Sequence, residues 1–174
     1  SARRQRQMCI RDSGWSVVER LNVLSVNLRN LELSNTISQN FENFTKNNIN
    51  ELVSLDKSIF DPYWQNSEAA FIETLDSCNQ NYLFKQYDED LLVGYAILGV
   101  TRNFSFLQRF GISLGYQNKG HGSELLKNVL NFAKDNKFTN IRLNTQENNK
   151  AAKSLYVKHG FELTKTNFTI LNAS

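Results

Sequence analysis

The sequence YQNKGHGSELL, residues 116–126, places two glycines, a lysine and a histidine directly before a run with helical spacing of apolar residues. Gly120 and Gly122 let the backbone approach a ligand closely, and Leu125 and Leu126 begin the apolar stripe of the helix. The first N–H groups of a helix lack intrahelical acceptors and lie at the positive end of its dipole. This stretch therefore predicts a site for phosphate or another anion.

Two common phosphate loops differ from this stretch at residues that their mechanisms require. Gly115 and Gly120 have the spacing of the pattern G-x-x-x-x-G-K-[ST], but His121 replaces the lysine that would reach the phosphates. The dinucleotide pattern G-x-G-x-x-G requires a third glycine, and Leu125 stands at that position. The loop therefore predicts neither a nucleoside triphosphate site nor a Rossmann site.

Hydrophobic periodicity predicts alternating helices and strands downstream of residue 45. Residues 91–100 are apolar on both faces, which indicates a central strand. Antiparallel hairpins followed by a crossover helix indicate a mixed sheet that helices cover. The expected elements are helices from about residue 45 and after Ser67, strands at 81–87, 91–100 and 104–114, a helix around 125–133, a strand at 139–145, a helix at 149–159 and a strand pair at 161–171.

Two separate motifs together resemble the GNAT superfamily of N-acetyltransferases. Residues 117–122, QNKGHG, match the pattern Q/R-x-x-G-x-G/A of its coenzyme A loop, and residues 149–161, NKAAKSLYVKHGF, resemble its second signature. The resemblance covers roughly residues 36–171 and implies an α/β (α+β) fold: a GNAT-like mixed, mostly antiparallel sheet flanked by helices, with a splayed central strand pair. It also implies acetyl-CoA as co-substrate, an amine as acceptor, and direct transfer between them.

The resemblance assigns coenzyme binding mainly to backbone groups. The strand before the loop would pair with the pantetheine arm, and the N–H of Ile112 would polarise the acetyl carbonyl. The family usually has proline at the position of Leu114 and often arginine at that of Gln117, so this chain departs from the pattern twice. Asn149 is either a ligand of the coenzyme arm or a helix N-cap. The expected coenzyme-binding residues are Ile112, Leu114, Gln117, Asn118, Lys119, Gly120, His121, Gly122, Ser123 and Asn149.

Tyr156 is the expected general acid, because a nearby phenol can protonate the thiolate of departing coenzyme A. Its alternative role is an aromatic packed on the sheet. No carboxylate occurs at residues 101–114, where many relatives carry a general base, and Glu147, Asp61 and Glu162 are the candidates that remain. An α-amine, with a pKa of about 7.7–8.0, needs less help than a lysine amine at about 10.4, which favours the α-amine.

The stretch FDPYWQNS, residues 60–67, is the expected acceptor wall. Tyr63 and Trp64 would line it, and Asp61 would attract a cationic amine. The alternative is a loop anchored by aromatic packing. The acceptor is then a small-molecule amine or a protein N-terminus or lysine. An alternative function from outside enzymology is a catalytically degenerate acyl-CoA-binding regulatory module.

Residues 3–13 resemble the translation of a sequencing-library adaptor, so we expect residues 1–13 to be non-native. Without that segment the 20 Lys and Arg fall to 16 and the 17 Asp and Glu fall to 16, so we expect no nucleic-acid partner. Residues 14–35 are expected to be strand-rich. Within them, residues 14–28 resemble residues 160–174, either as the tail of a truncated preceding repeat would or by chance. Residues 36–174 form the expected acetyltransferase domain.

The remaining expectations concern surroundings and partners. Neither a metal-binding spacing nor a run of 18 apolar residues occurs in the 174 residues, so we expect no metal and no membrane association. We expect a cytoplasmic protein that is a monomer or a homodimer.

Overall fold

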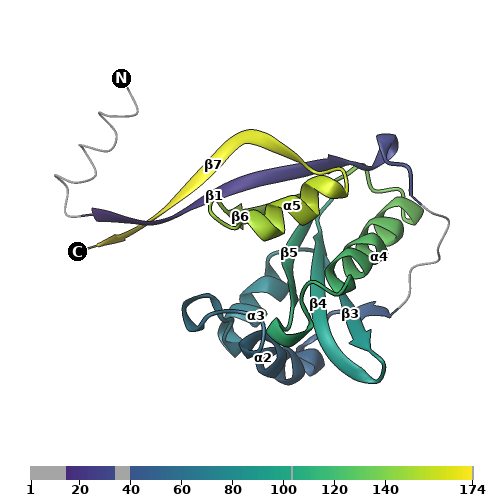
Figure 1. Cartoon of the computed structure of the whole chain (residues 1–174), viewed down its shortest axis with the longest axis horizontal. Helices are drawn as coiled ribbons and strands as arrows, with labels where there is room; N and C mark the ends of the chain where they lie inside the picture. The colour runs from purple at the N-terminus through teal and green to yellow at the C-terminus, as the bar shows by residue number, and fades with distance from the viewer. Residues whose placement is uncertain (1–14, 34–39, 103, 174) are drawn as a thin grey trace.

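The computed structural model describes residues 15–33, 40–102 and 104–173. The predicted non-native segment, residues 1–13, lies outside the described residues. A seven-stranded sheet in the order β2-β3-β4-β5-β6-β1-β7 runs through the molecule (Figure 1). Its strands are β1 (Trp15–Asn27), β2 (Phe41–Asn43), β3 (Gln80–Asp88), β4 (Leu91–Val100), β5 (Ser105–Ile112), β6 (Asn140–Gln146) and β7 (Glu162–Ala173).

All neighbouring strands are antiparallel except β5 and β6, which are parallel. The prediction of a mixed, mostly antiparallel sheet is therefore confirmed. The helices are α2 (Ile49–Lys57), α3 (Glu68–Asp76), α4 (His121–Asp135) and α5 (Lys150–Lys158), with short 3-10 turns η1 (Leu28–Asn30), η2 (Lys46–Asn48), η3 (Pro62–Trp64) and η4 (Leu114–Tyr116).

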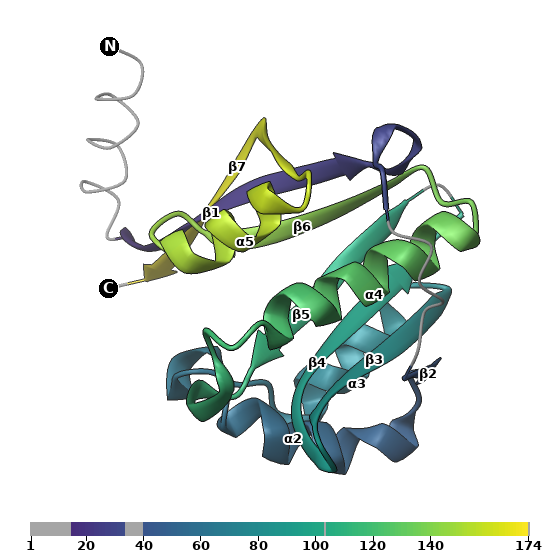
Figure 2. The same ribbon diagram turned by 45° about the vertical axis from the view of Figure 1, so that its right-hand side comes forward.

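Helices cover both faces of the sheet and create two hydrophobic cores (Figures 1 and 2). Ala96 and Leu98 of β4 face the core that α4 and α5 cover, whereas Tyr95 and Ile97 face the core that α2 and α3 cover. Alternate residues of β4 thus point to opposite faces, and both faces are buried. The predicted central position of residues 91–100 is confirmed.

Strand β1 is an interior strand, because it pairs with β6 on one side and β7 on the other. Leu24, Val26 and Leu28 are at most 2% exposed and pack in the core beneath α4 and α5. The segment before residue 34 therefore belongs to the same sheet as the rest of the chain. Its relation to a preceding repeat stays a prediction.

The predicted strand pair at residues 161–171 is wrong, because this region forms the single strand β7. The partner of β7 is β1, which comes from more than 130 residues earlier and is therefore invisible to local periodicity. The register of β7 against β1 shifts between Asn22 and Leu24, where residues 164–166 have no partner. This irregularity interrupts the pairing of β7 with β1 without dividing β7 into two strands.

Candidate active site

Strands β5 and β6 lie side by side at their beginnings and diverge toward their ends (Figure 2). They pair at only two positions, the last being Leu107–Leu143, although β5 continues to Ile112 and β6 to Gln146. Gln108 forms a β-bulge against β4 directly after the last pair. The splayed strand pair is thus confirmed, and β5 turns away from β6 where the bulge lies. We call the region between the two strand ends the opening.

The backbone N–H of Ile112 points toward the opening. The next residue, Ser113, donates its N–H to the carbonyl oxygen of Val93 at 2.7 Å. Hydrogen-bonded and non-hydrogen-bonded pairs alternate along an antiparallel ladder, so the neighbouring pair of Ile112 and Gly94 is non-hydrogen-bonded. The N–H and C=O of Ile112 therefore face away from β4. Gln117 Nε2 donates to that carbonyl at 3.0 Å, and the N–H remains directed at the opening.

The predicted strand at 104–114 is too long by two residues at its end, and Leu114 lies in the turn η4. The N–H of Leu114 donates to the carbonyl oxygen of Ser58 at the end of α2, at 3.2 Å. Tyr116 closes the turn by donating its N–H to Ser113 at 2.8 Å. The hydrogen bond from Leu114 to α2 ends the strand. Because its N–H is used in this bond, Leu114 can offer a ligand only its carbonyl oxygen.

The loop after η4 presents a run of backbone donors. Among the described residues, no acceptor receives the N–H groups of residues 117–123, and the first helical bond is from Glu124 N–H to the carbonyl of Gly120. Asn118 has φ of 60° and Gly120 has φ of 91°, so the chain twice adopts the left-handed conformation. Such conformations turn successive N–H groups to one side, as in anion-binding nests. The loop thus combines free donors with the positive end of the 15-residue helix α4.

Gly122 lies where α4, α5 and the end of β5 meet. A Cβ atom at this position would lie 3.3 Å from Cδ2 of Leu155 and 3.8 Å from Cγ1 of Ile112. A Cβ on Gly120 would meet nothing within 4 Å, so its left-handed φ, and not crowding, is what favours glycine there. The loop is therefore packed on one side and open on the other.

Side chains of the loop are mostly engaged within the protein. His121 Nε2 lies 3.3 Å from Asp88 Oδ1, and Lys119 Nζ lies 5.2 Å from the centre of the Tyr116 ring. The Ser123 hydroxyl lies 3.0 Å from His159 Nε2, and the other ring nitrogen of that histidine is 2.9 Å from a carbonyl oxygen. Nδ1 therefore donates to this carbonyl of Leu155, because a carbonyl oxygen can only accept. These contacts agree with a loop that offers backbone rather than side-chain donors.

Tyr156 of α5 is 6% exposed, and its ring packs between Phe110 of β5 and Phe161, with centroid distances of 5.8 and 5.7 Å. Its hydroxyl has no hydrogen-bond partner among the described residues. Burial raises the pKa of the Tyr156 phenol above its usual value, so the group stays protonated at neutral pH. The hydroxyl oxygen does not belong to the fully buried atoms that lack a partner, so it keeps some contact with the surface.

Asn149 is the N-cap of α5, because its side-chain oxygen accepts the N–H of Ala152 at 3.1 Å. The N-cap alternative is therefore realised, and only the amide nitrogen of its side chain is left for a ligand. The expected cap at Ser67 of α3 is also present, with the hydroxyl accepting from Ala70 N–H at 3.2 Å.

The expected acceptor wall lies on the connection between α2 and α3. Tyr63 is 66% exposed, Asp61 is exposed and Trp64 is half-buried, and the rings of Tyr63 and Trp64 meet edge to face at 5.0 Å. The connection packs against β5, since a Cβ on Gly111 would lie 2.4 Å from Ile59 and 3.0 Å from the Phe60 ring. The wall therefore adjoins the strand whose end carries Ile112.

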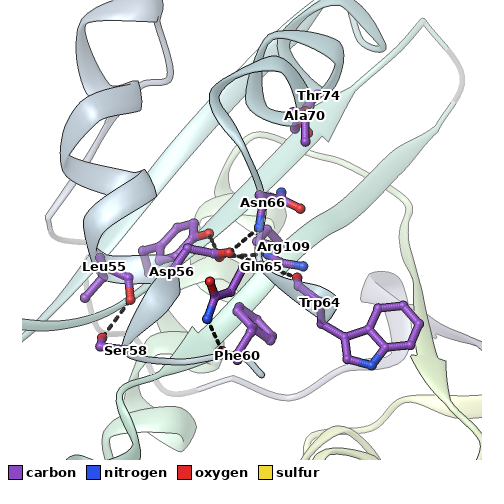
Figure 3. Close-up of polar contacts among 11 residues, drawn as sticks. Leu55, Asp56, Ser58, Phe60, Trp64, Gln65, Asn66, Ala70, Thr74 and Arg109 are labelled. Carbon is purple, nitrogen blue, oxygen red and sulfur yellow. Dashed lines mark hydrogen bonds and ion pairs between the residues drawn. The ribbon is translucent and has the colours of Figure 1, made fainter. Parts of the chain in front are cut away.

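A buried ion pair beneath this connection was missed by sequence reasoning. Asp56 of α2 is fully buried and is held by Arg109 of β5, with Nη2 at 2.7 Å and Nε at 3.0 Å (Figure 3). The hydroxyl of Tyr95 and the N–H of Asn66 also donate to it, at 2.5 and 2.6 Å. Burial, and then the charge of Asp56, raises the pKa of Tyr95. The sequence signal was an arginine, next to a glutamine, in a mostly apolar strand.

The candidate general bases lie at different distances from the opening. Glu162 pairs with Ser25 on β1, and β1 and β6 separate β7 from β5. At about 4.8 Å per strand spacing, Glu162 is roughly 14 Å from β5, too far for direct proton transfer. Glu147 follows the end of β6, and Asp61 follows the residue that packs on Gly111. Both are exposed and remain candidates.

No helix in residues 15–33, 40–102 and 104–173 is long and apolar enough to cross a membrane. In the same residues, no group of three or more His, Cys, Asp or Glu could hold a metal ion.

Comparison with known proteins gave consistent matches. A model described as the acetyltransferase (GNAT) family matches residues 49–161. The chain is 28% identical over 127 residues to the probable N-acetyltransferase san of Drosophila melanogaster, which covers 70% of this chain and 67% of the relative. The structure of the present chain resembles that of a GCN5-related N-acetyltransferase of Sphaerobacter thermophilus, with a TM-score of 0.69 and 14% identity. The match covers 95% of this chain and 54% of the other.

A further structural match is the paiA N-acetyltransferase of Thermoplasma acidophilum, solved in complex with coenzyme A. The TM-score is 0.58 at 16% identity, with coverage of 77% of this chain and 98% of that one. Among these matches, the chain spans about two thirds of the Drosophila relative and about half of the Sphaerobacter structure.

Proposed function

Because the chain belongs to the acetyltransferase (GNAT) family, we propose that it transfers the acetyl group of acetyl-CoA directly to a primary amine. The observation that carries the proposal is the Ile112 N–H, which points into the opening between β5 and β6. The free N–H groups of residues 117–123 follow it in the chain within a few residues. One strand end therefore brings together a donor for an acyl oxygen and a nest for phosphate.

The coenzyme fits the residues present. Its pyrophosphate would bind the N–H groups of residues 117–123 and the positive end of α4, with glycine at 120 and 122 for conformation and close approach. Its pantetheine arm would run along β5, beside the backbone of Ile112 and the carbonyl of Leu114. Asn149 would contribute only its amide nitrogen, because its oxygen caps α5.

Transfer requires a new bond from the amine nitrogen to the acetyl carbon and cleavage of the carbon–sulfur bond. Negative charge that develops on the carbonyl oxygen would be stabilised by the Ile112 N–H. The sulfur departs as a thiolate, and the Tyr156 phenol, protonated and without a partner among the described residues, would donate to it. The amine must lose a proton, to water or through Glu147 or Asp61.

The acceptor would bind on the other side of β5, against Asp61, Tyr63 and Trp64. Two aromatic rings and an exposed carboxylate suit an amine that carries apolar groups beside a positive charge. Because no carboxylate lies on β5 itself, an α-amine, which is partly neutral near pH 7.7–8.0, is the favoured class.

The testing experiment is a thiol-release assay with acetyl-CoA and a panel of amines: peptides with free N-termini, lysine side chains and small polyamines. We expect amine-dependent thiol release with an equal amount of acetylated product, highest for an α-amine. Coenzyme binding without turnover on any amine would contradict the proposal and support a regulatory acyl-CoA-binding module instead.

A further inference from the structure

Arg109 joins the strand that ends at Ile112 to the connection that carries the acceptor wall. Its Nε and Nη2 bond the two carboxylate oxygens of Asp56, and Nη2 also donates to the main-chain carbonyl of Trp64 at 2.6 Å. Its guanidinium lies 3.7 Å from the centre of the Phe60 ring. One side chain of β5 thus contacts the helix before the connection, the start of the connection and its middle.

The connection at residues 60–66 is tied at both of its ends as well. The Phe60 ring lies on Gly111 of β5, where a Cβ would leave it only 3.0 Å. The N–H of Asn66 donates to Asp56, and Gln65 Nε2 returns to the carbonyl of Phe60 at 2.9 Å. Figure 3 shows the bonds of Asn66 and Arg109 converging on Asp56 and the bond of Gln65 running to Phe60, while the indole of Trp64 projects away from Asp56. The main chain of the wall is therefore fixed, and the indole of Trp64 points away from these bonds.

Asp56 is unsuited to act as the general base. It is fully buried, and four donors occupy its two oxygens: Nε and Nη2 of Arg109, the Tyr95 hydroxyl and the Asn66 N–H. A carboxylate with these partners has no free lone pair directed at a substrate. A buried ion pair of this kind also adds little net stability, because desolvation offsets the attraction. What it does supply is a defined geometry across three elements.

We propose that Arg109 and Asp56 are positioning residues that hold the acceptor wall at a set distance from the end of β5. The inference rests on the proposed acetyl transfer, since the wall is the surface against which the amine would bind. A displacement of about 1 Å in a bound reactant can cost about a hundredfold in rate. A rigid link between β5 and the wall would therefore decide how well the amine meets the acetyl group.

The matched control is Lys85 of β3. Lys85 bonds Glu51 of the same helix α2 at 2.8 Å and Glu42 of β2 at 2.9 Å, and its side chain is 17% exposed, against 15% for Arg109. It thus ties α2 to the sheet as Arg109 does, but it has no contact with residues 60–66. Lys85→Met removes the ion pairs of α2 and β2 with β3 without touching the wall, although their carboxylates, Glu51 and Glu42, are 46% and 47% exposed whereas Asp56 is fully buried.

The test variant is Arg109→Lys, which keeps the charge but cannot hold both Asp56 oxygens and the Trp64 carbonyl with one ammonium group. We expect kcat/KM for the acceptor to fall about tenfold to a hundredfold, while the Kd for acetyl-CoA stays within about twofold, since the coenzyme loop is untouched. Lys85→Met should lower the denaturation midpoint and leave kcat/KM for the acceptor at the wild-type value. Adding guanidinium to Arg109→Ala should restore part of the lost kcat/KM.

Three outcomes are distinguishable. A wild-type chain without turnover would overturn the proposed acetyl transfer, and this inference with it. An active wild type whose Arg109→Lys variant loses stability but keeps its acceptor kcat/KM would overturn the inference alone. An equal fall in kcat/KM for Lys85→Met and Arg109→Lys would also overturn it, because any loosening of α2 would then have the same effect. If Arg109→Ala fails to fold, Arg109→Lys decides.

Discussion

The ring of Tyr156 packs against the ring of Phe110, with 5.8 Å between their centroids. The contact joins α5 to β5 beyond Leu107, the last residue of β5 that pairs with β6. Helix α5 therefore packs on the part of β5 that no longer pairs with β6. The Tyr156 hydroxyl makes no hydrogen bond to another described residue, so its proposed role as the acid can be tested by removing it alone.

Tyr156→Phe should slow the reaction without weakening the fold. We expect kcat to fall about a hundredfold, the range for loss of a general acid, and the Kd for acetyl-CoA to change little. Stability should change little, because the removed hydroxyl makes no hydrogen bond to another described residue. Tyr82→Phe is the control, since its hydroxyl bonds only the exposed Gln80. Equal kcat for Tyr156→Phe and wild type would remove Tyr156 as the acid.

Gly120→Asp should weaken coenzyme binding more than Gly120→Asn does. The left-handed φ of 91° strains any side chain at this position, so both variants should lose some stability, but only the carboxylate of Asp would repel a pyrophosphate at the N-terminus of α4, by up to ~2 kcal/mol. Gly120→Asn is the control, because it places an uncharged side chain at the same left-handed position. It should bind acetyl-CoA nearly as tightly as the wild type does. Thermal stabilisation by acetyl-CoA measures both variants. A stabilisation by acetyl-CoA that is the same in Gly120→Asp as in wild type would mean that the phosphates bind elsewhere.

Stability should decline above pH 10. Burial raises the pKa of Tyr156, and burial with the charge of Asp56 raises that of Tyr95, above the value of about 10 in the unfolded chain. A raised pKa contributes stability that is fully present below pH 10 and is lost as the pH rises toward the folded value. The denaturation midpoint should therefore be lower at pH 10.5 than at pH 8. The difference between the two midpoints should be smaller in Tyr156→Phe than in the wild type. A larger pH-dependent loss in that variant would contradict the raised pKa of Tyr156.

Sequence reasoning found the elements whose burial pattern is local. The apolar stripe of α4 and the two apolar faces of β4 are readable from neighbouring residues, as is the left-handed glycine at residue 160 that ends α5. The glycine loop before α4 was also predicted, because its glycines and its helix lie within a dozen residues, while its binding of the coenzyme stays a proposal. Asn149 could be placed at the start of α5 from the sequence, but only the structure shows that its side-chain oxygen accepts the N–H of Ala152 as an N-cap.

The features that sequence reasoning missed depend on contacts between distant residues. Asp56 and Arg109 are 53 positions apart, and neither belongs to a motif. The insertion of β1 between β6 and β7 follows from strand order, which periodicity does not encode. Leu114 lies outside β5, because its N–H donates to the carbonyl oxygen of Ser58 at the end of α2 instead of to a strand. Each case was decided by tertiary packing over local preference.

The most direct measurement replaces the Gly111–Ile112 amide with an ester, so that the N–H becomes an oxygen and the side chain is kept. This N–H faces the opening and makes no bond to β4, so stability should change little. We predict a fall in kcat of about a hundredfold or more, as for loss of an oxyanion donor. The same change at Leu114, whose N–H bonds Ser58, should lower stability and leave kcat nearly unchanged. A wild-type kcat for the ester at Ile112 would contradict acetyl transfer at the opening.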